Sequence, residues 1–345
     1  MAFYDGTGLL SQKDINGQVP EIFLCTSNRS AGKTTYFARL LVNRWRKDKS
    51  RKFMLVYRFK YELTDIANKF FKDIGELFFK DLEMTDEPGA GGLYKELFLN
   101  GEPCGYAVSL NSADQLKKMS HLFSDTDSMM FDEFMSEQNH YCSLEVEKLI
   151  SIHTSVARGQ GKQVRYVPIY MISNPVSLIN PYYTTLGISS RLNKNTKFLR
   201  GDGWVLEQGF NESASTAQSQ SAFNRAFSSS NYMAYNTQAV YLNDNQAFIE
   251  KVSGNGKYTL TLRFRGQDYG VIEYSELGII YITDKADSSF GFKLAITTND
   301  FQVNYVLLQQ YKNYLAILRQ YFEKGCFRFK NLQCKEVLMT AIGYY

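Results

Sequence analysis

The sequence contains few of the residues that build disulfide frameworks and metal sites. Its five cysteines are spread along 345 residues without a CxxC pair, and its three histidines, His121, His140 and His153, are not at zinc-ligand spacing. Such frameworks and sites need these groups close together in a recognisable pattern. The sequence therefore indicates neither a disulfide framework nor a structural metal.

Long hydrophobic runs are also missing. The longest uninterrupted apolar stretches are far shorter than the roughly 20 residues that a membrane-spanning helix requires. Residues 1–17 contain no basic segment followed by an apolar one, which a secretion signal would show. We therefore expect a soluble, cytosolic protein without a membrane partner. The net charge of +4 permits contact with a nucleic acid backbone but is far below that of a histone-like protein.

The length and the 44% of hydrophobic residues are sufficient for two hydrophobic cores, so we expect two domains. The first 180 residues alternate short apolar runs with amphipathic stretches, which is typical of a parallel sheet flanked by helices. The strands expected there are residues 21–25, 52–57, 106–110, 128–131 and 166–172, and the helices are residues 34–46 and 144–156.

A change of composition marks the domain boundary. From about Gly209 the chain is rich in Ser, Ala, Asn and Gln and poor in large aliphatic residues. The sequence therefore predicts a first domain at residues 1–200, a linker at 201–236 and a second domain at 237–345. Strands at residues 239–242, 257–264, 269–274 and 279–283, followed by a helix at 300–322, make the second domain a sheet with helices.

A phosphate-binding loop follows the first expected strand. Residues 26–35 read Thr-Ser-Asn-Arg-Ser-Ala-Gly-Lys-Thr-Thr and precede an amphipathic helix, as a Walker A loop requires. Gly32 lets the backbone approach phosphates, Lys33 reaches the terminal phosphates, and Thr34 ligates Mg²⁺. The predicted nucleotide contacts are Ser27, Asn28, Arg29, Ser30, Ala31, Gly32, Lys33, Thr34 and Thr35. Ser27 replaces the first glycine of the consensus, and a chance Gly-Lys-Thr at a helix start remains the alternative.

A second motif decides between these interpretations. The apolar residues 129–131 end in two adjacent carboxylates, Asp132 and Glu133, which point in different directions at a strand end. Asp132 can orient Mg²⁺ through its water shell, and Glu133 can polarise the water that attacks the γ-phosphate. By itself the pair favours an acidic turn after a buried strand. Together with the phosphate-binding loop it predicts an ATP-hydrolysing P-loop NTPase of the additional-strand, catalytic-glutamate class.

Three other polar side chains are candidates near the nucleotide. Asn174 follows the expected strand at 166–172 and is a candidate sensor, although Asn-Pro is also an ordinary turn signal. Arg158 follows the expected helix at 144–156 and could reach a neighbouring subunit's nucleotide. On the sequence alone, a solvated surface arginine is the better interpretation of Arg158. Arg29 could act on the phosphates of its own subunit or stack near the base.

Several sequence blocks, in the right order, resemble the DNA-packaging ATPases of small, protein-primed tailed bacteriophages of the phi-29 type. The resemblance extends from about residue 20 to about residue 335. The blocks are the arginine-bearing loop at 29–34, Leu-Val-Tyr-Arg-Phe-Lys-Tyr-Glu-Leu at 55–63, Phe-Asp-Glu-Phe at 131–134, Ser-Asn-Pro-Val-Ser-Leu-Ile-Asn-Pro-Tyr at 173–182, Tyr-Lys-Asn-Tyr at 311–314 and Gly-Cys-Phe-Arg-Phe at 325–329.

The resemblance implies a ring, expected to have five subunits, that docks on the portal vertex of an empty capsid and translocates double-stranded DNA inward. It implies that Lys33 and Glu133 are catalytic and that Arg158 acts in trans. Arg58 and Lys60 match a basic segment that would hold DNA phosphates, and Lys117 and Lys118 match loosely a region that acts across the subunit interface. A scaffold RNA is a further candidate partner. The expected location is the host cytoplasm and, transiently, the portal vertex, but not the mature virion.

The resemblance also implies that the C-terminal domain is an α+β, ribonuclease-H-like domain that has lost its nuclease activity. A two-metal nuclease needs several carboxylates that converge on the cations. The available acids are Asp268, Glu273, Glu276, Asp284 and Asp287, and no strand pattern places them together. Three other classes of function stay open: a large terminase with an active nuclease, a nucleotide switch that is not a motor, and a structural capsid-vertex component with a vestigial P-loop.

Overall fold

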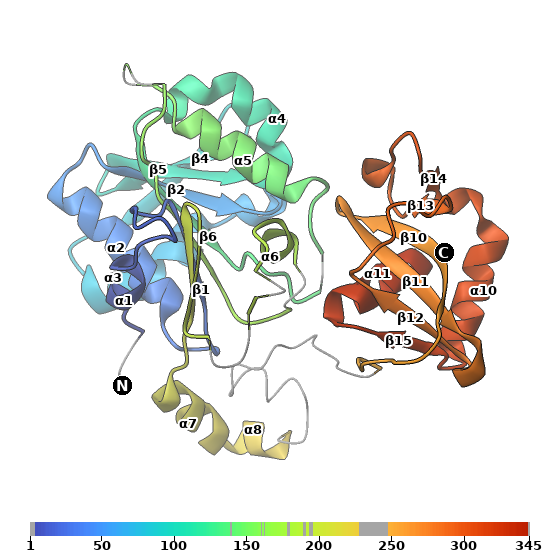
Figure 1. Cartoon of the computed structure of the whole chain (residues 1–345). Helices are drawn as coiled ribbons and strands as arrows, with labels where there is room; N and C mark the ends of the chain where they lie inside the picture. Colours follow the sequence, from blue (N-terminus) through green and yellow to red (C-terminus); the bar gives the residue numbers. More distant parts are fainter. Residues whose placement is uncertain are drawn as a thin grey trace. The chain divides into compact units, whose positions relative to one another are not determined.

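The computed structural model describes residues 4–138, 140–159, 161, 163–177, 180–188, 191–192, 196–227 and 248–343 (Figure 1). The chain divides into two compact units, residues 1–243 and 244–345. Within the described residues, no helix is both long and apolar enough to span a membrane. Each unit is built around its own sheet.

The first unit contains a nine-stranded sheet in the order β3-β4-β5-β2-β6-β7-β1-β9-β8. The six strands from β5 to β9 in this order are parallel, and the edge strands β3, β4 and β8 are antiparallel to their neighbours. The strands are β1 (Ile22–Thr26), β2 (Lys52–Tyr57), β3 (Met84–Gly89), β4 (Tyr94–Leu99), β5 (Glu102–Ser109), β6 (Thr126–Asp132), β7 (Ile169–Ser173), β8 (Phe198–Gly201) and β9 (Trp204–Gln208).

The order of the central strands confirms the predicted fold class. β7 lies between β1, which precedes the phosphate-binding loop, and β6, which ends in the acidic pair. This inserted strand is the additional strand of the predicted NTPase class. Because parallel strands end at the same edge of the sheet, the segments that follow β1, β6 and β7 lie close together at that edge.

Helices cover both faces of the first sheet (Figure 1). On one face the apolar side of α2, which includes Phe37, Leu41 and Trp45, belongs to one buried cluster with β1 and β2. On the other face α5 contributes Leu149 and Ile152 to a second cluster. The helices are α1 (Thr7–Leu10), α2 (Lys33–Lys47), α3 (Lys72–Phe78), α4 (Ala113–Leu116), α5 (Glu145–Val156), α6 (Pro181–Thr185), α7 (Glu212–Gln220) and α8 (Ala222–Ala226).

The predicted linker differs from the structure at its start. Residues 204–208 form β9, which pairs with β1 inside the sheet, because Trp204, Val205 and Leu206 are buried. Helices α7 and α8 also fall within the predicted linker. The hairpin of β3 and β4 was not expected from the sequence.

The second unit contains a six-stranded sheet in the order β14-β13-β10-β11-β12-β15. Three consecutive antiparallel strands are extended on the β10 side by two parallel strands, the strand order of ribonuclease-H-like domains, which confirms the predicted class. The elements are β10 (Lys257–Phe264), β11 (Gln267–Tyr274), β12 (Ile279–Thr283), β13 (Lys293–Ala295), β14 (Val306–Leu307), α10 (Lys312–Glu323), β15 (Phe327–Phe329) and α11 (Leu332–Gly343).

The helix predicted at residues 300–322 is wrong in its first half. α10 begins only at Lys312, because the preceding residues form short turns and β14. The Asp300 carboxylate fixes this region by accepting hydrogen bonds from the Gly266 amide (3.0 Å) and from the Thr297 hydroxyl (2.6 Å). The predicted strand at 239–242 lies outside the described residues.

Candidate active site

The phosphate-binding loop joins β1 to α2 at the carboxyl edge of the first sheet. Gly32 has a φ of 92° and directly precedes Lys33, the first residue of α2. Ser30 also has a left-handed backbone, with a φ of 60°, whereas Ser27 does not. The loop therefore turns at Ser30 and Gly32, and Ser27 needs no unrestricted backbone at the position of the first glycine.

Ser27 instead contributes a side-chain acceptor for Lys33. The buried ammonium Nζ of Lys33 donates to the carbonyl and hydroxyl oxygens of Ser27, each at 3.0 Å, and to the carbonyl of Asn28 at 3.2 Å. It also donates to Oδ1 of Asn174 at 3.2 Å. Burial lowers the pKa of Lys33. The candidate sensor Asn174 is thus in direct contact with the lysine of the loop.

Thr34 and Asp132 meet across the edge of the sheet. Thr34 Oγ1 donates to Oδ2 of Asp132 at 2.9 Å. Burial and the nearby carboxylate of Glu133 raise the pKa of Asp132 to about 6, although the hydrogen bond from Thr34 opposes the rise. Hydroxyl and carboxylate oxygens are ligands that Mg²⁺ accepts. The pair therefore has the chemistry of the predicted magnesium site.

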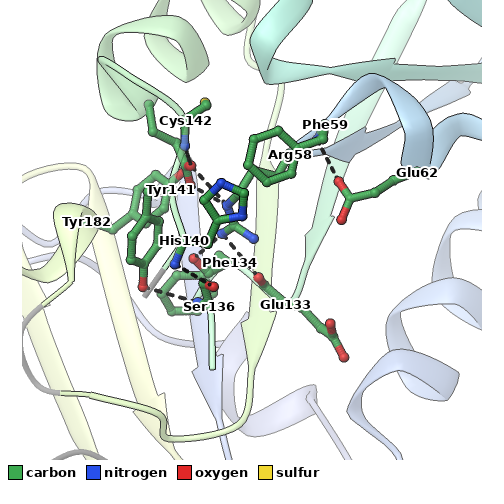
Figure 2. Close-up of polar contacts among 11 residues, drawn as sticks. Arg58, Phe59, Glu62, Glu133, Phe134, Ser136, His140, Tyr141, Cys142 and Tyr182 are labelled. Atoms are coloured by element: carbon green, nitrogen blue, oxygen red, sulfur yellow. Dashed lines mark hydrogen bonds and ion pairs between the residues drawn. The ribbon is translucent and has the colours of Figure 1, made fainter. Parts of the chain in front are cut away.

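Glu133 adopts an unusual backbone conformation directly after β6. Its φ is 54°, and its amide donates to Oδ1 of Asp132 at 2.9 Å. A non-glycine residue in this region costs about 1–3 kcal/mol and persists only where its surroundings hold it. The exposed Glu133 side chain points away from the polar cluster behind it (Figure 2). The turn separates the two carboxylates, as two different tasks require.

One cavity of about 320 Å³ brings most of the predicted site residues together. Ser27 and Asn28 lie outside the cavity wall and contact Lys33. The predicted residues that line it are Arg29, Ser30, Ala31, Gly32, Lys33, Thr34, Thr35, Asp132, Glu133 and Asn174.

Arg29 connects the two motifs. Its guanidinium forms an ion pair with Glu137, which lies four residues after Glu133. The contact crosses from the phosphate-binding loop to the segment that follows the acidic pair. The two roles predicted for Arg29, toward the phosphates or the base, remain predictions.

Arg158 lies away from this cavity, on the surface. It is exposed and follows Ala157, the residue after the end of α5. Lys117 and Lys118 are also exposed, at the start of a short 3-10 segment that packs against α5. Their proposed action on a neighbouring subunit requires this kind of exposure.

Arg58 does not lie where the sequence predicted. We expected a surface arginine that holds DNA phosphates, but Arg58 is only 7% exposed and forms an ion pair with the buried carboxylate of Glu145. The reason is that Glu145, the first residue of α5, lies 87 residues further along the chain than Arg58, and a sequence cannot reveal such a partner. Lys60 is exposed, in agreement with its predicted surface position.

The sequence also did not reveal two contacts of the loop and its surroundings. Asn28 is fully buried and exchanges two hydrogen bonds with the backbone of Asn211, at 2.9 and 3.1 Å. Gln218, on α7, donates to the Ser30 hydroxyl at 2.8 Å. The only available signal was the polar composition after Gly209, which instead favoured a linker.

The candidate acids of the second unit do not gather around a common point. Asp268 accepts from Arg263 at 2.8 Å and from the Tyr305 hydroxyl at 2.6 Å, and Asp284 pairs with Lys330. The other three candidates, Glu273, Glu276 and Asp287, are exposed. Within the described part of the chain, no group of three or more His, Cys, Asp or Glu side chains could hold a metal ion.

Comparison with known proteins places this geometry in a family. The model of the family "Podovirus DNA encapsidation protein (Gp16)" matches residues 2–342. The DNA packaging protein of Bacillus phage phi29 is 28% identical over 307 residues, which cover 88% of this chain and 87% of that protein. The DNA packaging protein of Bacillus phage B103 is 28% identical over 322 residues, which cover 92% and 93%.

Solved structures agree with this assignment. A chain of the bacteriophage Phi-29 viral genome packaging motor assembly is 25% identical, has a TM-score of 0.70 and covers 100% of this chain and 98% of its own length. A chain of the Phi-28 gp11 DNA packaging motor has a TM-score of 0.59 at 15% identity over 99% of this chain and 97% of that chain, which shows the fold alone. Since the family model spans nearly the whole sequence, this chain belongs to the podovirus DNA encapsidation proteins.

Proposed function

We propose that this protein hydrolyses ATP to drive double-stranded viral DNA into a preformed capsid through the portal vertex. The observation that carries the proposal is that two motifs meet at one cavity, Lys33 and Thr34 from the loop and Asp132 and Glu133 from the end of β6. Membership of the DNA encapsidation family supports the process in which the hydrolysis is used.

In this proposal Lys33 exchanges its contacts with Ser27 and Asn28 for oxygens of the terminal phosphates. Thr34 and Asp132 would hold Mg²⁺, Asp132 through the water shell, and the bound ion would supply charge that neutralises the phosphates. Glu133 accepts the proton of the attacking water. Asn174, which already contacts Lys33, responds to the presence of the γ-phosphate.

The proposed working form is a ring of five subunits on the portal, and the packaging motor assembly among the structural relatives supports an oligomer. Arg158 of one subunit offsets charge at the neighbour's nucleotide, as an arginine finger does. ATP binding tightens this contact and hydrolysis loosens it. The ring acts in the host cytoplasm and transiently at the portal vertex, and a scaffold RNA is a candidate partner in docking.

The DNA is held mainly by its phosphates, because a packaging motor must accept the entire genome whatever its sequence. The sequence predicted two DNA contacts, Arg58 and Lys60. Of these two residues, Lys60 lies on the surface. The second unit serves in nucleic-acid or portal docking. The ion pairs of Asp268 and Asp284 favour this role over metal-dependent cleavage.

Steady-state ATP hydrolysis by the wild type, with and without double-stranded DNA and empty capsids, tests the proposal. We expect stimulation by both. A rate of hydrolysis that neither DNA nor capsids increase would favour a nucleotide switch. The absence of hydrolysis would favour a structural vertex component. Cleavage of DNA by the second unit would favour a large terminase.

A further inference from the structure

A buried ion pair lies directly behind the acidic motif. The side chains of Arg58 and Glu145 are only 8% and 1% exposed, and Nε of Arg58 donates to both carboxylate oxygens, at 2.9 and 3.1 Å. Removing two charges from water is costly, and a buried pair is tolerated only where further hydrogen bonds satisfy both groups. The remaining partners of each group therefore indicate what the pair does.

Glu145 is held on several sides. Its carboxylate accepts from the hydroxyl of Tyr182 at 2.8 Å and from the amide of Cys142 at 2.9 Å, and Glu145 itself is the first residue of α5. The buried Tyr182 extends this support to α6. Together with Arg58, which follows β2, donors from three separate segments thus hold this carboxylate.

The other side of Arg58 faces the backbone of the acidic motif. Nη2 donates to the carbonyl oxygen of Phe134 at 2.8 Å and to that of Glu133 at 3.3 Å. The guanidinium also lies over the rings of Tyr141 and Phe131, 5.0 and 5.5 Å from their centres. Arg58 therefore bridges a fixed carboxylate and the peptide groups around Glu133.

The bridged peptide groups belong to the strained turn. Glu133 has a left-handed φ of 54°, and such a conformation persists only where neighbouring structure over-determines it. The Glu133 side chain is exposed, so packing does not fix it. Its direction depends on the backbone turn, which Arg58 holds at the carbonyl oxygens.

We propose that Glu145 is a positioning residue for ATP hydrolysis, because it fixes Arg58 on the carbonyl groups of Glu133 and Phe134 and so maintains the turn that directs Glu133. Glu145 does not touch the nucleotide and acts through Arg58. This inference rests on the proposed function, in which Glu133 activates water.

The first experiment compares Glu145→Gln with a matched control. Glu147→Gln removes an exposed carboxylate from the same turn of α5. The kcat and KM of ATP hydrolysis are measured in the presence of DNA and empty capsids. Nucleotide affinity is measured with a fluorescent ATP analogue. We expect Glu145→Gln to lower kcat by about 10- to 100-fold, as a misplaced catalytic group does. Its nucleotide affinity should be unchanged, and the Glu147→Gln variant should behave as the wild type.

A second variant separates positioning from stability. Glu145→Gln leaves Arg58 buried without its counter-charge and lowers Tm, whereas Arg58→Met/Glu145→Leu/Tyr182→Phe removes both charges and the hydroxyl. Replacing a buried pair by apolar residues of similar volume is often neutral or stabilising. We expect Tm to return toward the wild-type value in this triple variant while kcat stays low. Recovery of kcat together with Tm would show a merely structural pair and overturn the proposal.

Glu133→Gln, measured in parallel, distinguishes a failure of the positioning role of Glu145 from a failure of the proposed function. If wild-type hydrolysis depends on Glu133 but Glu145→Gln keeps the wild-type kcat, the positioning role is wrong and the proposed function stands. If Glu133→Gln hydrolyses ATP as fast as the wild type, the proposed function fails, and with it the role of Glu145.

Discussion

The acids of the candidate active site in the first unit and the candidate nuclease acids Asp268 and Asp284 in the second unit have different partners. At the sheet edge of the first unit, Asp132 and Glu133 form no ion pair with any described residue, and Asp132 contacts the hydroxyl of Thr34. Among the described residues of the second unit, five acids form ion pairs with basic side chains. These pairs are Arg263 with Asp268, Lys330 with Asp284, Arg265 with Glu336, Arg319 with Glu323 and Arg328 with Glu250.

This difference distinguishes acids that can form a binding site from acids that only resemble one. Carboxylates that face a cavity without basic partners can bind a cation or accept a proton, whereas paired carboxylates would first have to lose their partners. Asp268, on β11, and Asp284, directly after β12, are instead paired with Arg263 and Lys330. Substitutions in the two units should therefore affect different quantities.

The largest effect should come from the exposed arginine of the first unit. Arg158→Ala removes the charge offered to a neighbouring nucleotide, and an arginine finger contributes about 10³- to 10⁵-fold to kcat. Turnover by assembled rings should fall accordingly, while nucleotide binding by single subunits is retained. Full turnover in Arg158→Ala rings, or no recovery when they are mixed with Glu133→Gln subunits, would contradict the role in trans.

Glu133→Gln should reduce hydrolysis by about 10²- to 10⁴-fold, because the amide cannot accept the proton of the attacking water. Single-turnover measurements with radiolabelled ATP would check the loss, and equilibrium binding would show that affinity for ATP is kept. A matched substitution in the second unit, Asp284→Asn, should leave hydrolysis unchanged. Equal losses in both variants would break the contrast between the units.

Asp132→Asn should mainly change the requirement for Mg²⁺. A group that holds a metal through its water shell contributes about 10- to 100-fold to metal affinity. A titration of hydrolysis against Mg²⁺ concentration should therefore shift to higher concentration by this factor, and a chelator should abolish turnover of the wild type. An unchanged titration curve would exclude Asp132 from the metal site.

In the second unit the measurable effect should be on stability. Asp268→Asn weakens hydrogen bonds to Arg263 and Tyr305, and a hydrogen bond to a charged group contributes about 1.5–3 kcal/mol. Denaturant unfolding of the full chain should show the transition of this unit at lower denaturant concentration. An unaltered transition would mean that the pair does not stabilise the sheet.

The smallest effect should come from Asp284→Asn. Its pair with Lys330 is partly exposed, with side-chain exposures of 24% and 37%, and such pairs contribute about 0–1 kcal/mol. Neither stability nor hydrolysis should change clearly. Incubation of the wild type with DNA and Mn²⁺ should give no cleavage. Cleavage by the wild type that is lost in Asp284→Asn would instead support the hypothesis of a large terminase with an active nuclease.

Local patterns were sufficient to predict much of the fold. β2, β10 and β12 have the predicted bounds, because each is a short run rich in apolar and aromatic residues that ends at a charged residue. The hairpin of β3 and β4 was missed since its segment contains Pro88 and three nearby glycines, which locally indicate turns. β9 was missed because its strand identity depends on pairing with β1.

The candidate site was likewise predictable from the sequence only in part. Lys33, Thr34, Asp132 and Glu133 belong to short motifs whose spacing carries their chemistry, so the sequence was enough to propose them. The role of Arg58 depends on Glu145, a partner far away in the chain, and was misjudged as DNA contact. Contacts such as Asn28 with Asn211 likewise exist only after folding.

DNA packaging by rings of mixed composition would show whether ATP hydrolysis that depends on Glu133 drives DNA into the capsid. Wild-type and Glu133→Gln subunits would be combined in varying ratios with empty capsids, ATP and double-stranded DNA, and the DNA protected from nuclease would be measured. We expect protection by the wild type, a loss that rises with the fraction of Glu133→Gln subunits, and no protection by Glu133→Gln alone. Protected DNA in capsids supplied only with Glu133→Gln would contradict this expectation.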